Sequence, residues 1–170
     1  MRPTAGLAGA FVAAFAACRQ MAPMAPLEPQ QTLETFTLRQ SYQGRLGWEM
    51  QASQAWLKED SSAAILREPR MQIYQEGRVA SRLRAAKGFV QTATYDIRLS
   101  SQVVVNGVQE QAELSTDELH YSDQKRKFFT DKPVLVKKPG STMRGRGLEA
   151  TADLSEITIF DQKSVLERTP

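Results

Sequence analysis

Side chains that commonly carry out chemistry are scarce in this sequence. His120 is the only histidine and Cys18 the only cysteine, so the chain can form neither a cluster of imidazole and thiolate metal ligands nor an internal disulfide. Leu119 and Tyr121 flank His120 in an alternating run, which predicts a strand on which His120 points away from the core. No nucleophile-elbow motif accompanies it. The sequence therefore predicts a protein that is not an enzyme and holds no metal or cofactor.

A glycine-rich stretch over residues 140–150 approaches two nucleotide-binding patterns without completing either. GSTMRGRG (140–147) has the glycine spacing of a phosphate-binding loop, but Arg146 replaces the lysine and Gly147 replaces the hydroxyl residue that would bind magnesium. GRGLEA (145–150) resembles part of a dinucleotide fingerprint but lacks the surrounding βαβ unit. We therefore expect these glycines to make a tight turn or to let backbones approach closely.

The amino-terminal residues have the pattern of a secretory signal peptide over residues 1–17. Arg2 precedes an apolar run of 13 residues, Ala5–Ala17, which ends at Cys18. As a helix this run would span about 20 Å, less than the roughly 30 Å of a bilayer core. The segment FAAC (15–18) is similar to a bacterial lipobox, which implies lipid attachment at Cys18. The alternative is a secreted protein cleaved after an alanine, in which Cys18 has no special role.

Residues 18–32 form a predicted linker, and residues 33–170 a single domain. Pro23, Pro26 and Pro29 recur at every third position, which favours an extended spacer of up to about 40 Å. The chain has 170 residues, a net charge of +3 and 24% charged residues. No dense basic run is interleaved with aromatic residues, so the charge does not indicate a nucleic-acid binder.

Strand patterns dominate the domain, which is predicted to be all-β. Trp48, Met50 and Ala52 alternate with polar residues, and a second alternating run covers residues 79–85. Asn106-Gly107 predicts a tight turn. Residues 148–159 could be fitted to a helix, but their Thr, Asp and Ser content and β-branched end favour strands.

An internal repeat relates two parts of the domain at an offset of 31 residues. Residues 83–105 align without gaps on residues 114–136, and residues 147–159 resemble a partial third copy. Repeats of this length indicate stacked β-hairpins. Two architectures fit the repeat: an open jelly roll or folded-over antiparallel sheet, and a right-handed β-solenoid.

The sequence motifs in residues 116–150 resemble those of a known family. Thr116-Asp117, Leu119 and Tyr121 are followed by Thr130, Pro133-Val134 and then by Gly140, Arg144-Gly145, Gly147-Leu148 and Ala150. These residues resemble the sequence motifs of the LptC family, the periplasmic, membrane-anchored component of the bacterial lipopolysaccharide export (Lpt) machinery. The resemblance implies a β-taco-like jelly roll and favours the folded-over sheet. It also implies a role in outer-membrane biogenesis, at the inner membrane. Members of the family more often keep a transmembrane helix where this chain has Cys18.

The resemblance implies a passive relay of lipopolysaccharide. An inner-membrane ABC transporter would load the chain near its N-terminal strand, Leu33–Ser41, and an LptA-like periplasmic bridge protein would receive the lipid near its C-terminal strand, Ile157–Glu167. Period-two strands would supply an apolar groove, for which the candidate residues are Phe36, Trp48, Met50, Ile73, Leu83, Ile97, Leu99, Tyr121, Phe128, Val134, Val136 and Ile159. Plain core packing explains each of these residues equally well.

Two other functions remain open from the sequence. The chain could be a lipoprotein scaffold with a solid β-solenoid core, or the bridge protein of the same pathway. An uneven set of basic residues could attract lipid phosphates or an acidic partner, although a solvated strand face is the favoured interpretation. These residues are Lys125, Arg126, Lys127, Lys132, Lys137, Lys138, Arg144 and Arg146.

Overall fold

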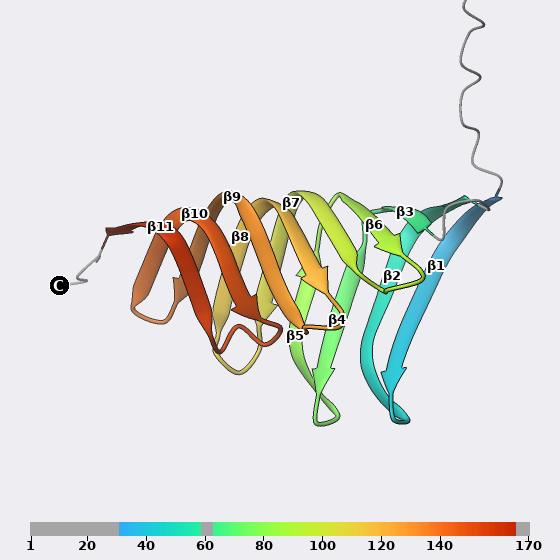
Figure 1. Ribbon diagram of the computed structural model, residues 1–170, viewed down its shortest axis with the longest axis horizontal. Helices are drawn as coiled ribbons and strands as arrows, with labels where there is room; N and C mark the ends of the chain where they lie inside the picture. Colours follow the sequence, from blue (N-terminus) through green and yellow to red (C-terminus); the bar gives the residue numbers. More distant parts are fainter. Residues whose placement is uncertain (1–30, 59–62, 166–170) are drawn as a thin grey trace, which may run out of the picture.

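A computed structural model describes residues 31–58 and 63–165 of the chain, and this part forms one antiparallel sheet of eleven strands (Figure 1). The predicted signal peptide, Cys18 and nearly all of the predicted linker lie outside the described residues. The strands are β1 (Gln31–Tyr42), β2 (Arg45–Lys58), β3 (Ala63–Arg67), β4 (Arg70–Gln75), β5 (Arg78–Arg84), β6 (Lys87–Gln91), β7 (Ile97–Gly107), β8 (Ala112–Ser122), β9 (Lys127–Lys138), β10 (Ser141–Thr151) and β11 (Ile157–Val165).

The sheet is folded over on itself. The first part of β2 pairs with β4 and its last part with β3, while β7 pairs with β6 at its start and with β5 at its end. Therefore β3 and β4 behave as one strand interrupted at Glu68–Pro69, and β5 and β6 as one strand interrupted at Ala85–Ala86. The long strands curve over the upper edge in Figure 1, so that each contributes to two facing layers.

We call the two layers wall A and wall B, the edge that joins them the crease, and the opposite edge the mouth. Wall A consists of β4, β5 and residues 36–42, 45–52, 103–107, 112–116, 134–138 and 141–146. Wall B consists of β3, β6 and residues 54–58, 97–100, 119–122, 127–130, 148–151 and 157–159.

Unusual backbone conformations mark the crease. Thr35, Glu68, Ser101 and Gln102 have positive φ angles between 50° and 65°, and Gly147 has a φ of 77°. The pairing register shifts between Ser100 and Val103 in β7, and between Arg146 and Leu148 in β10. Such bulges bend a strand and increase its twist. The bulges therefore let a continuous hydrogen-bonded sheet turn through the crease.

Inward side chains form rows of cross-strand neighbours, and these rows explain the repeat in the sequence. In wall A, Leu83 lies opposite Val105, and 31 residues later Leu114 lies opposite Val136. In wall B, the equivalent pairs are Val90 with Ile97 and Tyr121 with Phe128. Each copy of the repeat is thus one pair of strands that passes from one wall to the other.

The all-β, folded-over prediction is confirmed, and the predicted position of one turn needs correction. All the pairings described are antiparallel between strands that are mostly consecutive, which rules out the alternative β-solenoid. Asn106-Gly107 is not a turn but the end of β7, and the turn follows at Val108–Gln111. Pro133 lies within β9, at the crease. Residues 148–159 form a strand, a turn and a strand, as the composition predicts.

Candidate functional site

The structure brings all twelve candidate groove residues into one apolar interior between the walls. Ten of them are at most 4% exposed and belong to a single core cluster. Phe36 on β1 and Ile159 on β11 are half-buried and pack against this cluster from its two ends. The period-two pattern therefore identified inward-facing residues on eight of the eleven strands, and none of the twelve lies on β3, β6 or β10.

The interior is filled by side chains in this conformation. Trp48, Met50, Phe128 and Val136 have no solvent-exposed surface. The surface hollows described, of about 250–500 Å³, lie on the outer faces, at the crease or at the mouth. At most two of the twelve candidates line any one of these hollows. The two walls therefore contact each other directly, as they do in a closed sandwich.

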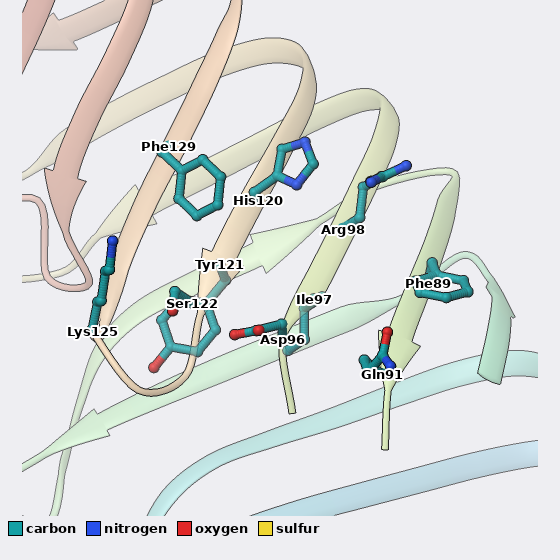
Figure 2. Close-up of a pocket in the computed structure, with 10 residues that line it drawn as sticks. All are labelled: Phe89, Gln91, Asp96, Ile97, Arg98, His120, Tyr121, Ser122, Lys125 and Phe129. Atoms are coloured by element: carbon teal, nitrogen blue, oxygen red, sulfur yellow. The ribbon is translucent and has the colours of Figure 1, made fainter. Parts of the chain in front are cut away.

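One of these hollows, of about 250 Å³, lies on the outer face of wall B (Figure 2). Phe89, Arg98, His120 and Phe129 are successive cross-strand neighbours there on β6, β7, β8 and β9. The His120 and Phe129 rings are stacked with their centroids 5.0 Å apart, and His120 Nε2 is 3.0 Å from Glu118 Oε1. His120 therefore points outward, as the sequence predicts, and serves as part of an outer aromatic row.

The two ends of the sheet remain open. β1 pairs only with β2, and β11 pairs only with β10, so each presents one unpaired backbone edge within the described residues. Core side chains at these ends are only half-buried: Leu33, Phe36 and Leu38 on β1, and Ile157 and Ile159 on β11. An open edge beside apolar side chains is a template for pairing with another strand.

At the mouth, a buried carboxylate joins the two walls. Trp48 Nε1 on β2 donates a hydrogen bond of 2.7 Å to Asp123 Oδ1 in the β8–β9 turn, and the Tyr42 hydroxyl donates to the same oxygen. Asp123 is 7% exposed. Burial, and then the Asp123 carboxylate, raise the pKa of Tyr42 well above its usual value. Asp123 stands in the turn-forming tetrad SDQK (122–125), and the sequence alone does not reveal these bonds because the partners lie 75 and 81 positions away.

The predicted basic cluster is divided in space. Lys127 pairs with Glu149 across wall B, where the Nζ and Oε1 atoms are 2.5 Å apart, and Lys137 lies 3.8 Å from Glu113 on wall A. Lys132 pairs with its neighbour Asp131 near the crease at 3.2 Å. These exposed pairs contribute little to stability. Their arrangement agrees with the favoured interpretation of a solvated strand face.

The glycines of residues 140–147 serve the backbone, as expected. Gly140 has a φ of 73° in the β9–β10 turn, where a Cβ would meet open space. A Cβ at Gly145 would lie 2.6 Å from the backbone oxygen of Asp161 on β11. Gly147 occupies the β10 bulge with a φ of 77°. These three glycines therefore allow a turn, a close approach of two strands and a bend in β10. Each of these structural roles accounts for its glycine without a phosphate-binding function.

A comparison with known protein families matches residues 5–166 to the family described as "Lipopolysaccharide-assembly, LptC-related". The chain belongs to the LptC family. This membership connects it with lipopolysaccharide transport, at the periplasmic side of the inner membrane, and with a family of transport components. No curated protein matches the chain. Across residues 31–58 and 63–165 we find no helix long and apolar enough to cross a membrane.

Proposed function

We propose that this LptC-family chain is a passive relay whose interior holds the acyl chains of lipopolysaccharide between wall A and wall B. The observation that carries this proposal is the apolar interior, which runs without interruption from β1 to β11 and is only half-buried at both ends. Each acyl CH₂ moved out of water gains about 0.8 kcal/mol, so a chain of about a dozen carbons gains about 10 kcal/mol. Such lipids need a continuous apolar path across the periplasm.

The closed core also favours a second candidate, a scaffold that never admits lipid. Its specific support is the complete burial of Trp48, Met50 and Phe128. The two candidates differ in what touches the inward face in cells. In a relay, lipid contacts inward side chains at least transiently, whereas in a scaffold only protein does so.

Two adjacent residues offer a matched test. Phe128 is fully buried and points inward, whereas Phe129 is 43% exposed and points outward on the same strand. A photo-reactive residue at each position, activated in cells, should give a lipopolysaccharide adduct at position 128 and none at position 129. Adducts only at position 129 or at the outward Lys127, or no adduct anywhere, would refute the inward groove and favour the scaffold.

We further propose that β1 receives the ABC transporter and β11 the LptA-like bridge protein, both by strand addition. The open backbone edges and the half-buried Leu38 and Ile159 beside them support these contacts. A photo-reactive residue at Thr37 should cross-link only to transporter subunits, and one at Phe160 only to the bridge protein. Both variants cross-linking to the same partner would contradict this assignment of the two ends.

Membrane attachment is proposed to follow cleavage of the signal peptide, residues 1–17, and lipidation of Cys18. The lipobox-like sequence before Cys18 supports it, and multiple acyl chains give a firm anchor because each buried CH₂ contributes about 0.8 kcal/mol. The linker to residue 32 would then hold the domain, residues 33–170, away from the membrane. A Cys18→Ser variant should move to the soluble fraction after a carbonate wash. Its retention in the membrane pellet would rule out the lipid anchor.

A further inference from the structure

Within residues 31–58 and 63–165, the mouth is a long boundary between the walls that no backbone ladder closes. Neighbouring strands within each wall are joined by continuous registers, such as the eight paired positions between β10 and β11. The crease is likewise crossed by the strands themselves. Across the mouth, by contrast, the contacts described join turns and side chains. A lipid that reaches the interior from the side therefore disrupts the least structure if it passes through the mouth.

Three side chains, which we call the latch, hold the mouth together near its β1 end. Tyr42 and Trp48 extend from wall A and donate to Asp123 Oδ1 in the β8–β9 turn of wall B. The Asp123 backbone N–H in turn donates to Asp96 Oδ1 at 3.1 Å, which fixes the turn to its neighbour. Hydrogen bonds to a carboxylate are about twice as strong as neutral ones. The latch is therefore the strongest polar connection described between the two walls.

Neighbouring contacts reinforce the latch. Tyr95, in the loop between β6 and β7, packs edge-on against Trp48 with the ring centroids 6.2 Å apart. Arg126, in the same turn as Asp123, donates a 3.3 Å hydrogen bond to the backbone oxygen of Tyr74 on wall A. Its guanidinium carbon also lies 5.9 Å from the centre of the Tyr42 ring. Loops of wall B thus contact wall A at several points within one small region.

Gly47 gives the latch its geometry. A Cβ at this position would lie 2.2 Å from Cε2 and 2.5 Å from Cδ2 of the Tyr42 ring. The ring therefore lies directly over the glycine, and no larger residue fits without moving it. Because Gly47 does not have a positive φ angle, its value here is space for the Tyr42 ring rather than backbone freedom. Gly47 is a positioning residue that sets the place of the Tyr42 hydroxyl.

We propose that the latch formed by Tyr42, Trp48 and Asp123 is the gate through which lipopolysaccharide passes into the interior. This inference rests on the proposed relay function. In the closed form the walls touch and the interior is full, so lipid can occupy it only after the walls separate at the mouth. Separation breaks both bonds to Asp123 and lets water reach the carboxylate. The latch therefore controls how often the interior is open.

Farther along the mouth, a tight apolar contact forms the other point of closure. Leu154, in the β10–β11 turn, is fully buried, and a Cβ at Gly107 of wall A would lie 3.2 Å from Leu154 Cβ. This contact has no polar bond to break. It can act as the hinge side of the mouth while the latch side opens.

The gate can be tested with the purified full chain carrying a photo-reactive residue at position 128, mixed with lipopolysaccharide and flash-irradiated after increasing times. Asp123→Asn keeps the size of the side chain but removes its charge, and Tyr42→Phe keeps the ring but removes one donor. Gly47→Ala displaces the ring without touching any bonding group. Weakening one charge-assisted bond should accelerate adduct formation about three- to tenfold in each variant.

Asp153→Asn provides the matched control. Asp153 also lies in a turn of wall B, but the hydrogen bonds described for its carboxylate come from Thr151 and Ser155, next to it in the same wall, and none comes from wall A. This variant should form adducts at the wild-type rate. A second measurement, acrylamide quenching of Trp48 in a Trp56→Phe background, should increase in Asp123→Asn before any lipid is added.

The outcomes separate the gate from the relay. Wild-type adducts with unchanged or slower rates in Asp123→Asn, Tyr42→Phe and Gly47→Ala would overturn the gate and leave the relay intact. No adduct in any form of the protein would overturn both. An equal acceleration in the control Asp153→Asn would show that any loosened turn has this effect, and would also overturn the gate.

Discussion

Replacement of Gly145 by alanine should detach β11 from the sheet. The added Cβ would lie 2.3 Å from Ile159 Cγ2 and 2.6 Å from the Asp161 backbone oxygen. Ordinary contacts of this kind are about 3.5 Å or longer, so the β11 backbone must move by roughly 1 Å. Overpacking of this size costs about 1–3 kcal/mol. The thermal midpoint of Gly145→Ala should therefore fall by roughly 3–10 °C.

The location of the damage separates this explanation from a general loss of stability. Amide hydrogen exchange should accelerate in residues 157–165 and remain unchanged in β4 and β5, because β11 forms backbone pairs only with β10 among the described strands. Gly140→Ala is the matched control, since its Cβ meets open space and the substitution costs only the left-handed backbone, about 1–2 kcal/mol. A Gly145→Ala variant with wild-type melting and unchanged β11 protection would refute the close-approach argument.

Three further perturbations follow from burial. Phe128→Ala should lower the free energy of unfolding by about 3–5 kcal/mol in a urea titration, whereas its exposed neighbour Phe129→Ala should lower it by less than about 1 kcal/mol. Burial raises the pKa of Tyr121 from its usual value near 10 to about 12, so the unfolded chain loses this proton at lower pH than the folded protein does. The free energy of unfolding should therefore fall by about 1.4 kcal/mol per pH unit between pH 10 and 12 on account of Tyr121. Tyr121→Phe should remove this part of the pH dependence, as measured by urea titrations across that range. Among the described residues the buried Ser81 hydroxyl has no hydrogen-bond partner, so Ser81→Ala should leave the thermal midpoint unchanged or raise it, and a clear decrease would contradict this.

Local sequence patterns were enough to predict most of the strands and their inward faces. The alternation around Trp48 and Met50 identified the inward face of β2, because successive side chains of a strand point to opposite sides. The 31-residue repeat aligns Leu83 with Leu114 and Val105 with Val136. In the structure, Leu83 pairs with Val105 and Leu114 pairs with Val136, so the repeat reflects equivalent strand pairs. Both signals survive in the sequence because strand pairing between chain neighbours is nearly a local property.

The closure of the mouth could not be predicted in the same way. Asp123 stands in a turn-forming tetrad, SDQK, and turn chemistry explains an aspartate there without any distant partner. Its bonds to Tyr42 and Trp48 depend on how far the crease brings the walls together, which no single segment encodes. The predicted turn at Asn106-Gly107 was wrong for a related reason. Gly107 leaves space for the β10–β11 turn, which packs against wall A at this position, and it does not form a hairpin turn.

The crease itself leaves a trace in the sequence that alternation alone does not reveal. Most long strands contain two or three exposed or half-exposed residues in a row at the crease: Ser53-Gln54 in β2, residues 100–102 in β7, Asp117-Glu118 in β8 and residues 131–133 in β9. In a flat sheet such runs would move a side chain to the wrong face and destabilise the pairing. In a folded sheet they lie on the convex side of the bend, where outward side chains spread apart and inward positions are too crowded to fill. An interruption in the middle of successive strands, with apolar alternation restored on both sides, therefore indicates strands that bend sharply. The antiparallel pairing of consecutive strands then shows that these bends fold one sheet over on itself.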